Sequence, residues 1–303
     1  MLDRTARTSL TTAFVIIVMC TLATQASAQD PLWGGDLVGR IDSLALASIE
    51  GGSVAALSIG VKRGGDLLLT KGYGLADIEN GVSATAETVY RIGSITKQFT
   101  AAAVMQLVEA GQIDIDASMT EYLPDYPAAG QDVTIRHLLT HTSGIKSYTG
   151  LASWAPKKTL DLSDEELVDL FKDEPVDFAP GERFLYNNSG FYLLDMIIEA
   201  VSGESYRDYL DAHVFGPLGM SRSLYCDERP IVPGRAEGYE QDGGELVNAE
   251  YLSMNQPGAA GALCSTVPDL LLWTSALRSG RVVSGASYGQ MTISGTLNSG
   301  DDT

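Results

Sequence analysis

The sequence predicts a mixed α/β (α+β) fold, in which an antiparallel sheet flanked by helices is joined to a mostly helical subdomain. Two nearly continuous apolar stretches, residues 53–61 and 67–74, flank the turn Gly64-Gly65-Asp66. This pattern predicts a β-hairpin with both faces covered. A long helical pattern follows Ser94, and beyond it the chain changes to short helices and loops.

The first 28 residues resemble an export signal. Arg4 and Arg7 give a basic start, residues 13–23 are apolar, and Ala26-Ser27-Ala28 supplies the small residues that a signal peptidase needs. The apolar run is too short to span a bilayer, and no later stretch is long enough. We therefore expect Sec export and a mature protein that is periplasmic or secreted.

The remaining helices are expected where apolar residues recur at helical spacing. Residues 36–50 form an amphipathic pattern that ends at Gly51-Gly52. Further helices are predicted in residues 134–144, 163–172, 190–203, 204–215 and 266–277. Strand-like and loop material occupies residues 221–256.

The charge of the chain excludes some classes of partner. Twenty basic and 39 acidic residues give a formal net charge of −19 at pH 7. Such a surface repels nucleic acid and anionic lipid head groups, and no basic patch offsets it. We expect no nucleic-acid partner, no membrane span and a monomer.

Ser94 and Lys97 are the first candidate catalytic residues. They stand three residues apart at the start of the long helix, so their side chains share one face. A serine hydroxyl needs a neighbour that takes its proton. Burial and the positive end of a helix both disfavour the ammonium form, which can bring a lysine into the working range.

The Ser-x-x-Lys spacing is weak evidence when it is taken alone. With 26 serines and 7 lysines in the chain, chance predicts about 0.6 matches. A second match, Ser143-Gly144-Ile145-Lys146, starts in a Thr-Ser-Gly loop with no long apolar helix after it. The sequence context therefore favours Ser94 over Ser143 as the nucleophile.

A second motif, Tyr186-Asn187-Asn188, lies on a turn at the mouth of a predicted helix. Side chains at such a turn face a cleft more readily than the core. The alternative is an asparagine that only caps the next helix. Its occurrence about 90 residues after Ser94-x-x-Lys97 favours the catalytic interpretation.

In these motifs the sequence resembles the serine β-lactamase and penicillin-binding-protein-like family, in its class C and esterase-like branch. The resemblance covers nearly all of the chain after the export signal. It rests on the segments Gly72–Asp77, Tyr90–Lys97, His137–Ile145, Phe184–Phe191 and Ala260–Leu270. The family uses Ser-x-x-Lys together with Ser-Asp-Asn and Lys-Thr-Gly motifs, and Tyr186-x-Asn188 stands where the second motif is expected.

The resemblance implies a role for each matching residue. Ser94 would attack a carbonyl and become acylated, and Lys97 and Tyr186 would share its proton, pass it to the leaving group and later activate water. Asn188 would hold the substrate amide or the Lys97 side chain. The Ser94 backbone N–H would form half of an oxyanion hole.

The third motif of the family, Lys-Thr-Gly or His-x-Gly near the C-terminus, is absent from the sequence. We therefore expect the C-terminal strands and the second oxyanion donor to be missing, and one such donor is worth ~10²–10³ in turnover. The hairpin would then show an unpaired edge and an uncovered apolar face. This pattern favours a fragment of a longer protein.

The resemblance and the elements together give the expected domain organisation. Residues 1–28 are the signal peptide, and residues 29–303 are one β-lactamase-related domain that is incomplete at its C-terminus. Its sheet part is expected in residues 32–91 and about 257–303, and its helical part in residues about 92–256.

Two cysteines, Cys226 and Cys264, remain after the export signal. In an oxidising compartment an even pair is a candidate disulfide. The alternative is two buried free thiols. The three histidines are not spaced as metal ligands, so we expect neither a metal nor a cofactor.

The sequence thus predicts an exported serine hydrolase that forms an acyl-enzyme on Ser94. Its substrate would be a small molecule or peptide: a β-lactam, a D-amino-acid peptide or a small ester. The alternative is a catalytically inactive, truncated relative that at most binds cell-wall peptide.

Overall fold

A computed structural model describes residues 36–127, 130 and 132–303 of the chain. These residues form two compact units: unit 1 contains residues 36–88 and 233–250, and unit 2 contains residues 89–232 and 251–303. The expected export signal, residues 1–28, lies outside the described residues. Helices and antiparallel sheets confirm the predicted mixed α/β fold class.

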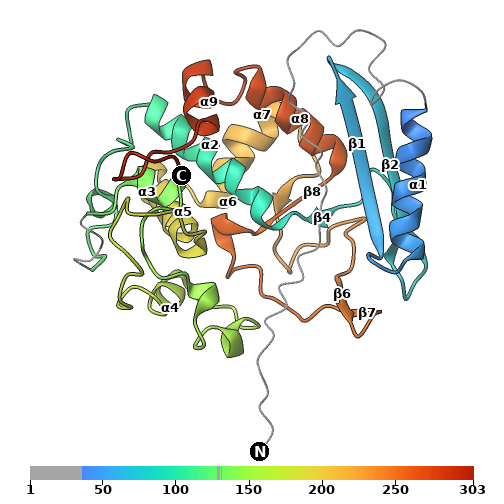
Figure 1. Ribbon diagram of the computed structural model, residues 1–303, viewed down its shortest axis with the longest axis horizontal. Helices are drawn as coiled ribbons and strands as arrows, with labels where there is room; N and C mark the ends of the chain where they lie inside the picture. Colours follow the sequence, from blue (N-terminus) through green and yellow to red (C-terminus); the bar gives the residue numbers. More distant parts are fainter. Residues whose placement is uncertain (1–35, 128–129, 131) are drawn as a thin grey trace, which may run out of the picture. The chain divides into compact units, whose positions relative to one another are not determined.

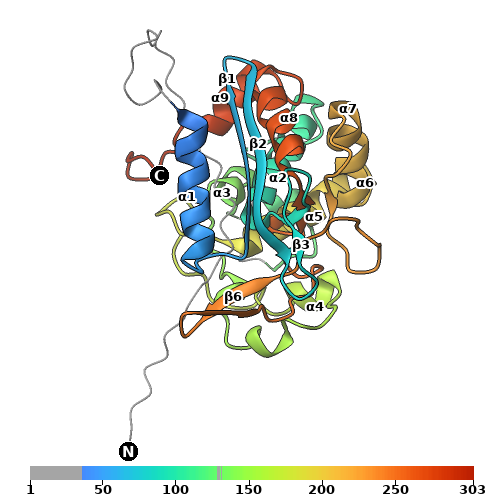
Figure 2. The same ribbon diagram turned by 90° about the vertical axis from the view of Figure 1, so that its right-hand side faces the viewer.

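Unit 1 is a strand hairpin accompanied by one long helix (Figure 2). Its elements are α1 (Leu37–Glu50), β1 (Ala56–Arg63), β2 (Asp66–Asp77), β3 (Val82–Ser83), β6 (Tyr239–Asp242) and β7 (Glu245–Asn248). The hairpin pairs antiparallel from Ala56 opposite Gly74 to Arg63 opposite Asp66, so the predicted turn at residues 64–66 is confirmed. The Tyr73 hydroxyl of β2 donates to the Asp42 carboxylate of α1 over 2.6 Å, which ties the helix to the strand.

The hairpin is less covered than its apolar sequence predicts. Next to its turn, Leu67 is 58% exposed and Leu68 is 38% exposed. In the described part of the chain the strand order is β1-β2-β3, so β1 is an edge strand. The expectation that both faces are covered is therefore wrong at this end, because apolar composition alone does not supply a covering layer.

Unit 2 consists of helices around one small sheet (Figure 1). Its α-helices are α2 (Thr96–Glu109), α3 (Ile135–Leu139), α4 (Asp164–Val168), α5 (Asn188–Ser202), α6 (Tyr206–Leu210), α7 (Gly216–Leu218), α8 (Val267–Arg278) and α9 (Gly285–Thr292). Its strands are β4 (Tyr90–Arg91), β5 (Leu224–Tyr225) and β8 (Leu263–Ser265). The shorter helical turns are η1 (Gly93–Ile95), η2 (Met119–Glu121), η4 (Tyr148–Gly150), η5 (Ala155–Lys157), η6 (Asp211–Phe215) and η7 (Gly258–Ala260).

The core of unit 2 is organised on α2, which packs against α5 and η7. Phe99, on the first turn of α2, is fully buried and stacks on Trp273 of α8 with ring centroids 4.0 Å apart. Most of the α2 circumference is buried. A helix held on so many sides gives a rigid base for the side chains at its start.

The helix starts agree with their sequence signals better than the helix ends. The Ser163 side chain accepts from the Glu166 N–H in the predicted capping box, which satisfies a backbone donor that a helix start leaves free. The helix was expected to continue to residue 172, but α4 ends at Val168. Tighter turns follow, in which the Phe171 N–H donates to the Val168 carbonyl and the Phe171 side chain is buried.

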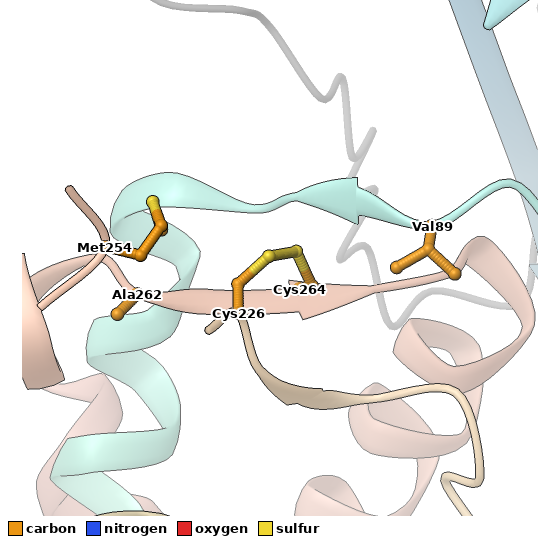
Figure 3. Close-up of a cluster of buried hydrophobic side chains, with 5 residues drawn as sticks. All are labelled: Val89, Cys226, Met254, Ala262 and Cys264. Carbon is orange, nitrogen blue, oxygen red and sulfur yellow. A yellow bond between two sulfur atoms is a disulfide. The ribbon is translucent and has the colours of Figure 1, made fainter. Parts of the chain in front are cut away.

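A disulfide joins the small sheet of unit 2 to the segment beside it (Figure 3). Cys264 lies on β8 between β4 and β5, and it is joined to Cys226 in a disulfide with the Cα atoms 5.1 Å apart. Both cysteines are fully buried in a cluster with Val89, Met254 and Ala262. The bond therefore links β8 to the segment that follows β5.

We predict that reducing this disulfide lowers the free energy of unfolding by ~3–4 kcal/mol, because the bond closes a loop of 38 residues in the unfolded chain. Urea unfolding with and without reductant measures the change. A Cys226→Ala/Cys264→Ala variant is the control and should not respond to reductant. Under denaturing, non-reducing conditions the full chain should take up one alkyl label, on Cys20; three labels would contradict the bond.

Candidate active site

Ser94 and Lys97 lie where the small sheet of unit 2 leads into α2. The Ile92 N–H donates to the Leu263 carbonyl over 2.9 Å, so the chain is still tied to β8 two residues before the serine. Gly93 then has φ +51°, a left-handed conformation that favours glycine. After this change in chain direction, Ser94 lies exposed on η1, and Lys97 lies in the first turn of α2, where it is only 7% exposed.

The structure brings the four sequence-predicted residues together. The Tyr186 hydroxyl donates to Ser94 Oγ over 2.7 Å, and Lys97 Nζ lies 3.4 Å from the same oxygen. Lys97 Nζ also donates to Asn188 Oδ1 over 2.8 Å. All four residues belong to unit 2, so a hydroxyl, an amine, a phenol and an amide meet around one point.

The environment of Lys97 favours the neutral amine. Burial lowers the pKa of Lys97 to about 7, since the ammonium form loses its hydration. Besides Ser94 Oγ, the amine has two oxygen acceptors, Asn188 Oδ1 and the Ala260 carbonyl, the latter at 2.7 Å. Its remaining surroundings include the rings of Tyr186 and Phe191, whose centroids lie 4.8 and 5.4 Å away. An amine with this pKa can accept a proton near neutral pH.

Tyr186 differs from Lys97 in its protonation state. Burial raises the pKa of Tyr186, and the hydrogen bond to Ser94 opposes that rise. At neutral pH the residue is therefore a phenol that can donate a proton. Of the two groups beside Ser94 Oγ, Lys97 is thus the candidate base and Tyr186 the candidate acid.

Asn188 is held in place by hydrogen bonds to the start of η4. Its Nδ2 donates to Thr149 Oγ1 over 3.0 Å, and its backbone N–H donates to Ser147 Oγ over 3.2 Å. These bonds aim Oδ1 at Lys97. Asn187, and not Asn188, caps α5: its side chain accepts from the Gly190 N–H over 2.8 Å. The two asparagines therefore divide the capping and site roles that the sequence left open.

The η7 turn, which supplies the Ala260 carbonyl, is fixed by side chains from two helices. Thr100 of α2 donates to the Ala259 carbonyl over 2.7 Å. Asp195 of α5 accepts from the Ala259 N–H over 2.9 Å, and burial raises the pKa of Asp195 well above its ordinary value. Sequence analysis missed both residues; the available signal for Asp195 is one carboxylate inside the apolar run of α5.

The second Ser-x-x-Lys match is not a catalytic pair. Ser143 is 1% exposed, and its hydroxyl accepts from the Ile145 N–H. Lys146 forms an ion pair with Asp177. The choice of Ser94 over Ser143 therefore agrees with the geometry.

The histidines occupy separate places in the fold. His137 takes part in the capping box of α3, His213 pairs with Glu204 over 2.9 Å, and His141 packs beside Tyr186. Within residues 36–127, 130 and 132–303, no group of three or more His, Cys, Asp or Glu side chains is placed to hold a metal ion. Across the same described ranges, no helix is both long enough and apolar enough to cross a bilayer.

The sequence is similar to that of known proteins. The model of the Beta-lactamase family matches residues 41–301. Human serine beta-lactamase-like protein LACTB, mitochondrial, is 30% identical over an alignment of 287 residues. The match covers 72% of this chain and 52% of that protein. The chain spans between 52% and 58% of the length of the first curated relatives.

Solved structures show the same fold. The octameric penicillin-binding protein homologue from Pyrococcus abyssi has a TM-score of 0.73 and 35% identity, covering 85% of this chain and 60% of that one. D-amino acid amidase from Ochrobactrum anthropi SV3 has a TM-score of 0.74 and 27% identity, covering 84% and 73%. Since a relative of known structure is an octamer, the monomer expected for this chain stays a prediction. The chain belongs to the Beta-lactamase family.

Proposed function

We propose that this protein is a serine hydrolase that forms an acyl-enzyme on Ser94. The observation that carries the proposal is the convergence of two proton-transfer groups on one exposed hydroxyl. Tyr186 OH lies 2.7 Å and Lys97 Nζ 3.4 Å from Ser94 Oγ. Burial lowers the pKa of Lys97 to about 7, so the neutral amine that can accept the proton is accessible near physiological pH.

The reaction follows from these positions. Lys97 takes the Ser94 proton while Ser94 Oγ forms a bond to the substrate carbonyl carbon. The bond to the leaving group then breaks, and the Tyr186 phenol supplies the proton that the leaving group needs. Lys97 then returns its proton to the Tyr186 phenolate. Water next attacks the acyl ester with the same groups acting as base and acid, which restores Ser94.

The substrate proposed is a β-lactam, a D-amino-acid peptide or a small ester. All three present a carbonyl that can acylate a serine, and all three agree with membership of this family. The names of a penicillin-binding homologue and a D-amino acid amidase among the structural neighbours support the first two classes. The alternative is a non-catalytic relative that only binds cell-wall peptide.

We predict that a fluorescent penicillin or a fluorophosphonate forms one covalent adduct on Ser94. Peptide mapping by mass spectrometry locates the adduct. Ser94→Ala should abolish it, whereas Ser143→Ala, the matched control, should leave it intact. Tyr186→Phe should slow acylation by about 10²–10⁴, the usual contribution of a positioned acid or base.

A label on another residue would remove Ser94 from the role of nucleophile. A chain that unfolds cooperatively in urea but takes up neither label would contradict the hydrolase proposal and support the binding alternative. Competition by ester, D-amino-acid amide and lactam substrates then ranks the three classes.

We also propose that the protein is exported and that residues 1–28 are removed. The basic start, apolar run and Ala26-Ser27-Ala28 support this proposal. N-terminal sequencing of the protein secreted by a bacterial host should begin at Gln29. A product that keeps Met1 and remains in the cytoplasm would contradict it.

A further inference from the structure

His141 occupies an unusual backbone position directly beside the candidate active site. It follows α3, and its φ is +59°, which makes it the one non-glycine residue with positive φ among the described residues. A residue other than glycine rarely adopts this left-handed conformation. Such a conformation persists only where surrounding contacts determine it, and it is found most often at functional sites.

The His141 carbonyl and ring nitrogen both contact the segment around Tyr186. The Leu185 N–H donates to the His141 carbonyl over 2.9 Å, and the Asn187 N–H donates to His141 Nδ1 over 3.1 Å. These two donors are the residues immediately before and after Tyr186. His141 therefore fixes the backbone on both sides of the tyrosine with one carbonyl and one ring nitrogen.

The imidazole ring also packs on the tyrosine itself. The centroids of His141 and Tyr186 are 4.6 Å apart. Phe184 lies edge-on at 5.7 Å and Phe191 at 5.1 Å, so three aromatic rings surround the imidazole. The Tyr186 ring thus has the imidazole as one neighbour and Lys97 Nζ as another.

We propose that His141 is a positioning residue that holds the Tyr186 phenol against Ser94, with its imidazole neutral and Nδ1 as a hydrogen-bond acceptor. This inference rests on the proposed function. His141 acts through Tyr186 and has no proton-transfer role of its own. Because Nδ1 accepts from a backbone N–H, the ring proton lies on Nε2.

The electrostatic surroundings agree with a neutral ring. Burial, and next the charge of Lys97, lower the pKa of His141 to about 4. Protonation of Nδ1 would break its bond with the Asn187 N–H. It would also place a second cation near Lys97, whose own ammonium form is already disfavoured.

Two variants separate the hydrogen bond from the backbone strain. His141→Gly removes the side chain and adopts a left-handed conformation without cost. His141→Asn also tolerates that conformation, and its Oδ1 can stand where Nδ1 accepts from Asn187. The pair therefore differs mainly in the acceptor, and neither variant forces a strained backbone.

The test is the acylation rate with the penicillin or fluorophosphonate probe, resolved into a limiting rate constant and a half-saturating concentration. His141→Gly should lower the limiting rate constant by about 10–100-fold, since a displacement of ~1 Å near the reacting atoms has that effect. The half-saturating concentration should stay within about threefold. His141→Asn should recover most of the rate, and in a Tyr186→Phe background His141→Gly should cost almost nothing further.

Several outcomes would overturn the inference. One is that the His141→Gly variant is acylated as fast as the unchanged chain. Another is that His141→Gly lowers the acylation rate constant by the same factor in the Tyr186→Phe background as in the unchanged chain. A His141→Asn variant as slow as His141→Gly would contradict the role given to Nδ1.

Hydrogen exchange separates this inference from the proposed function. The Asn187 amide should exchange at least about tenfold faster in His141→Gly and remain protected in His141→Asn. If the unchanged chain takes up no label, the hydrolase proposal fails and the exchange result alone decides whether His141 holds this segment. Equal protection in all three proteins would then overturn it.

Discussion

The amine of Lys97 lies in a buried position where its charged form is poorly stabilised, and the rest of the site depends on that constraint. Its oxygen partners are an amide oxygen, a backbone carbonyl and the Ser94 hydroxyl, and these neutral groups cannot neutralise a full charge. Aromatic rings occupy much of the remaining space around it. An unshifted lysine in this place would be an ammonium ion and could not accept the Ser94 proton at neutral pH.

Three segments that are far apart in the sequence have to be held close together to form this environment around the amine. They are the start of α2, the turn before α5 and the η7 turn. The packing of α2 against α5 and η7 sets their overall positions. Individual hydrogen bonds then set the orientation of each group: Thr149 aims Asn188, and Thr100 and Asp195 fix the turn that presents Ala260. In our proposal, His141 likewise orients Tyr186.

The residues that the sequence identifies are those whose chemistry depends on local spacing. Ser94 and Lys97 stand three residues apart where η1 leads into α2, and Tyr186 and Asn188 flank a helix start, so short motifs reveal them. Ala260 contacts Lys97 through its backbone carbonyl, and such a contact cannot be predicted from the type of residue. Asp195 and His141 act through tertiary contacts with segments that are 64 and 46 residues away, respectively. Local propensity likewise predicts where α4 starts and that Phe171 is buried, but not that the helix ends at Val168.

The decisive measurement is the pH dependence of the Ser94 acylation rate, because it joins the protonation state of Lys97 to the reaction of the serine hydroxyl. The active form of Lys97 is the neutral amine, so the rate should rise about tenfold per pH unit below the pKa and level off above about pH 7. A rate that is constant between pH 5 and 9, or one that still rises towards the ordinary lysine pKa of ~10.4, would contradict the account.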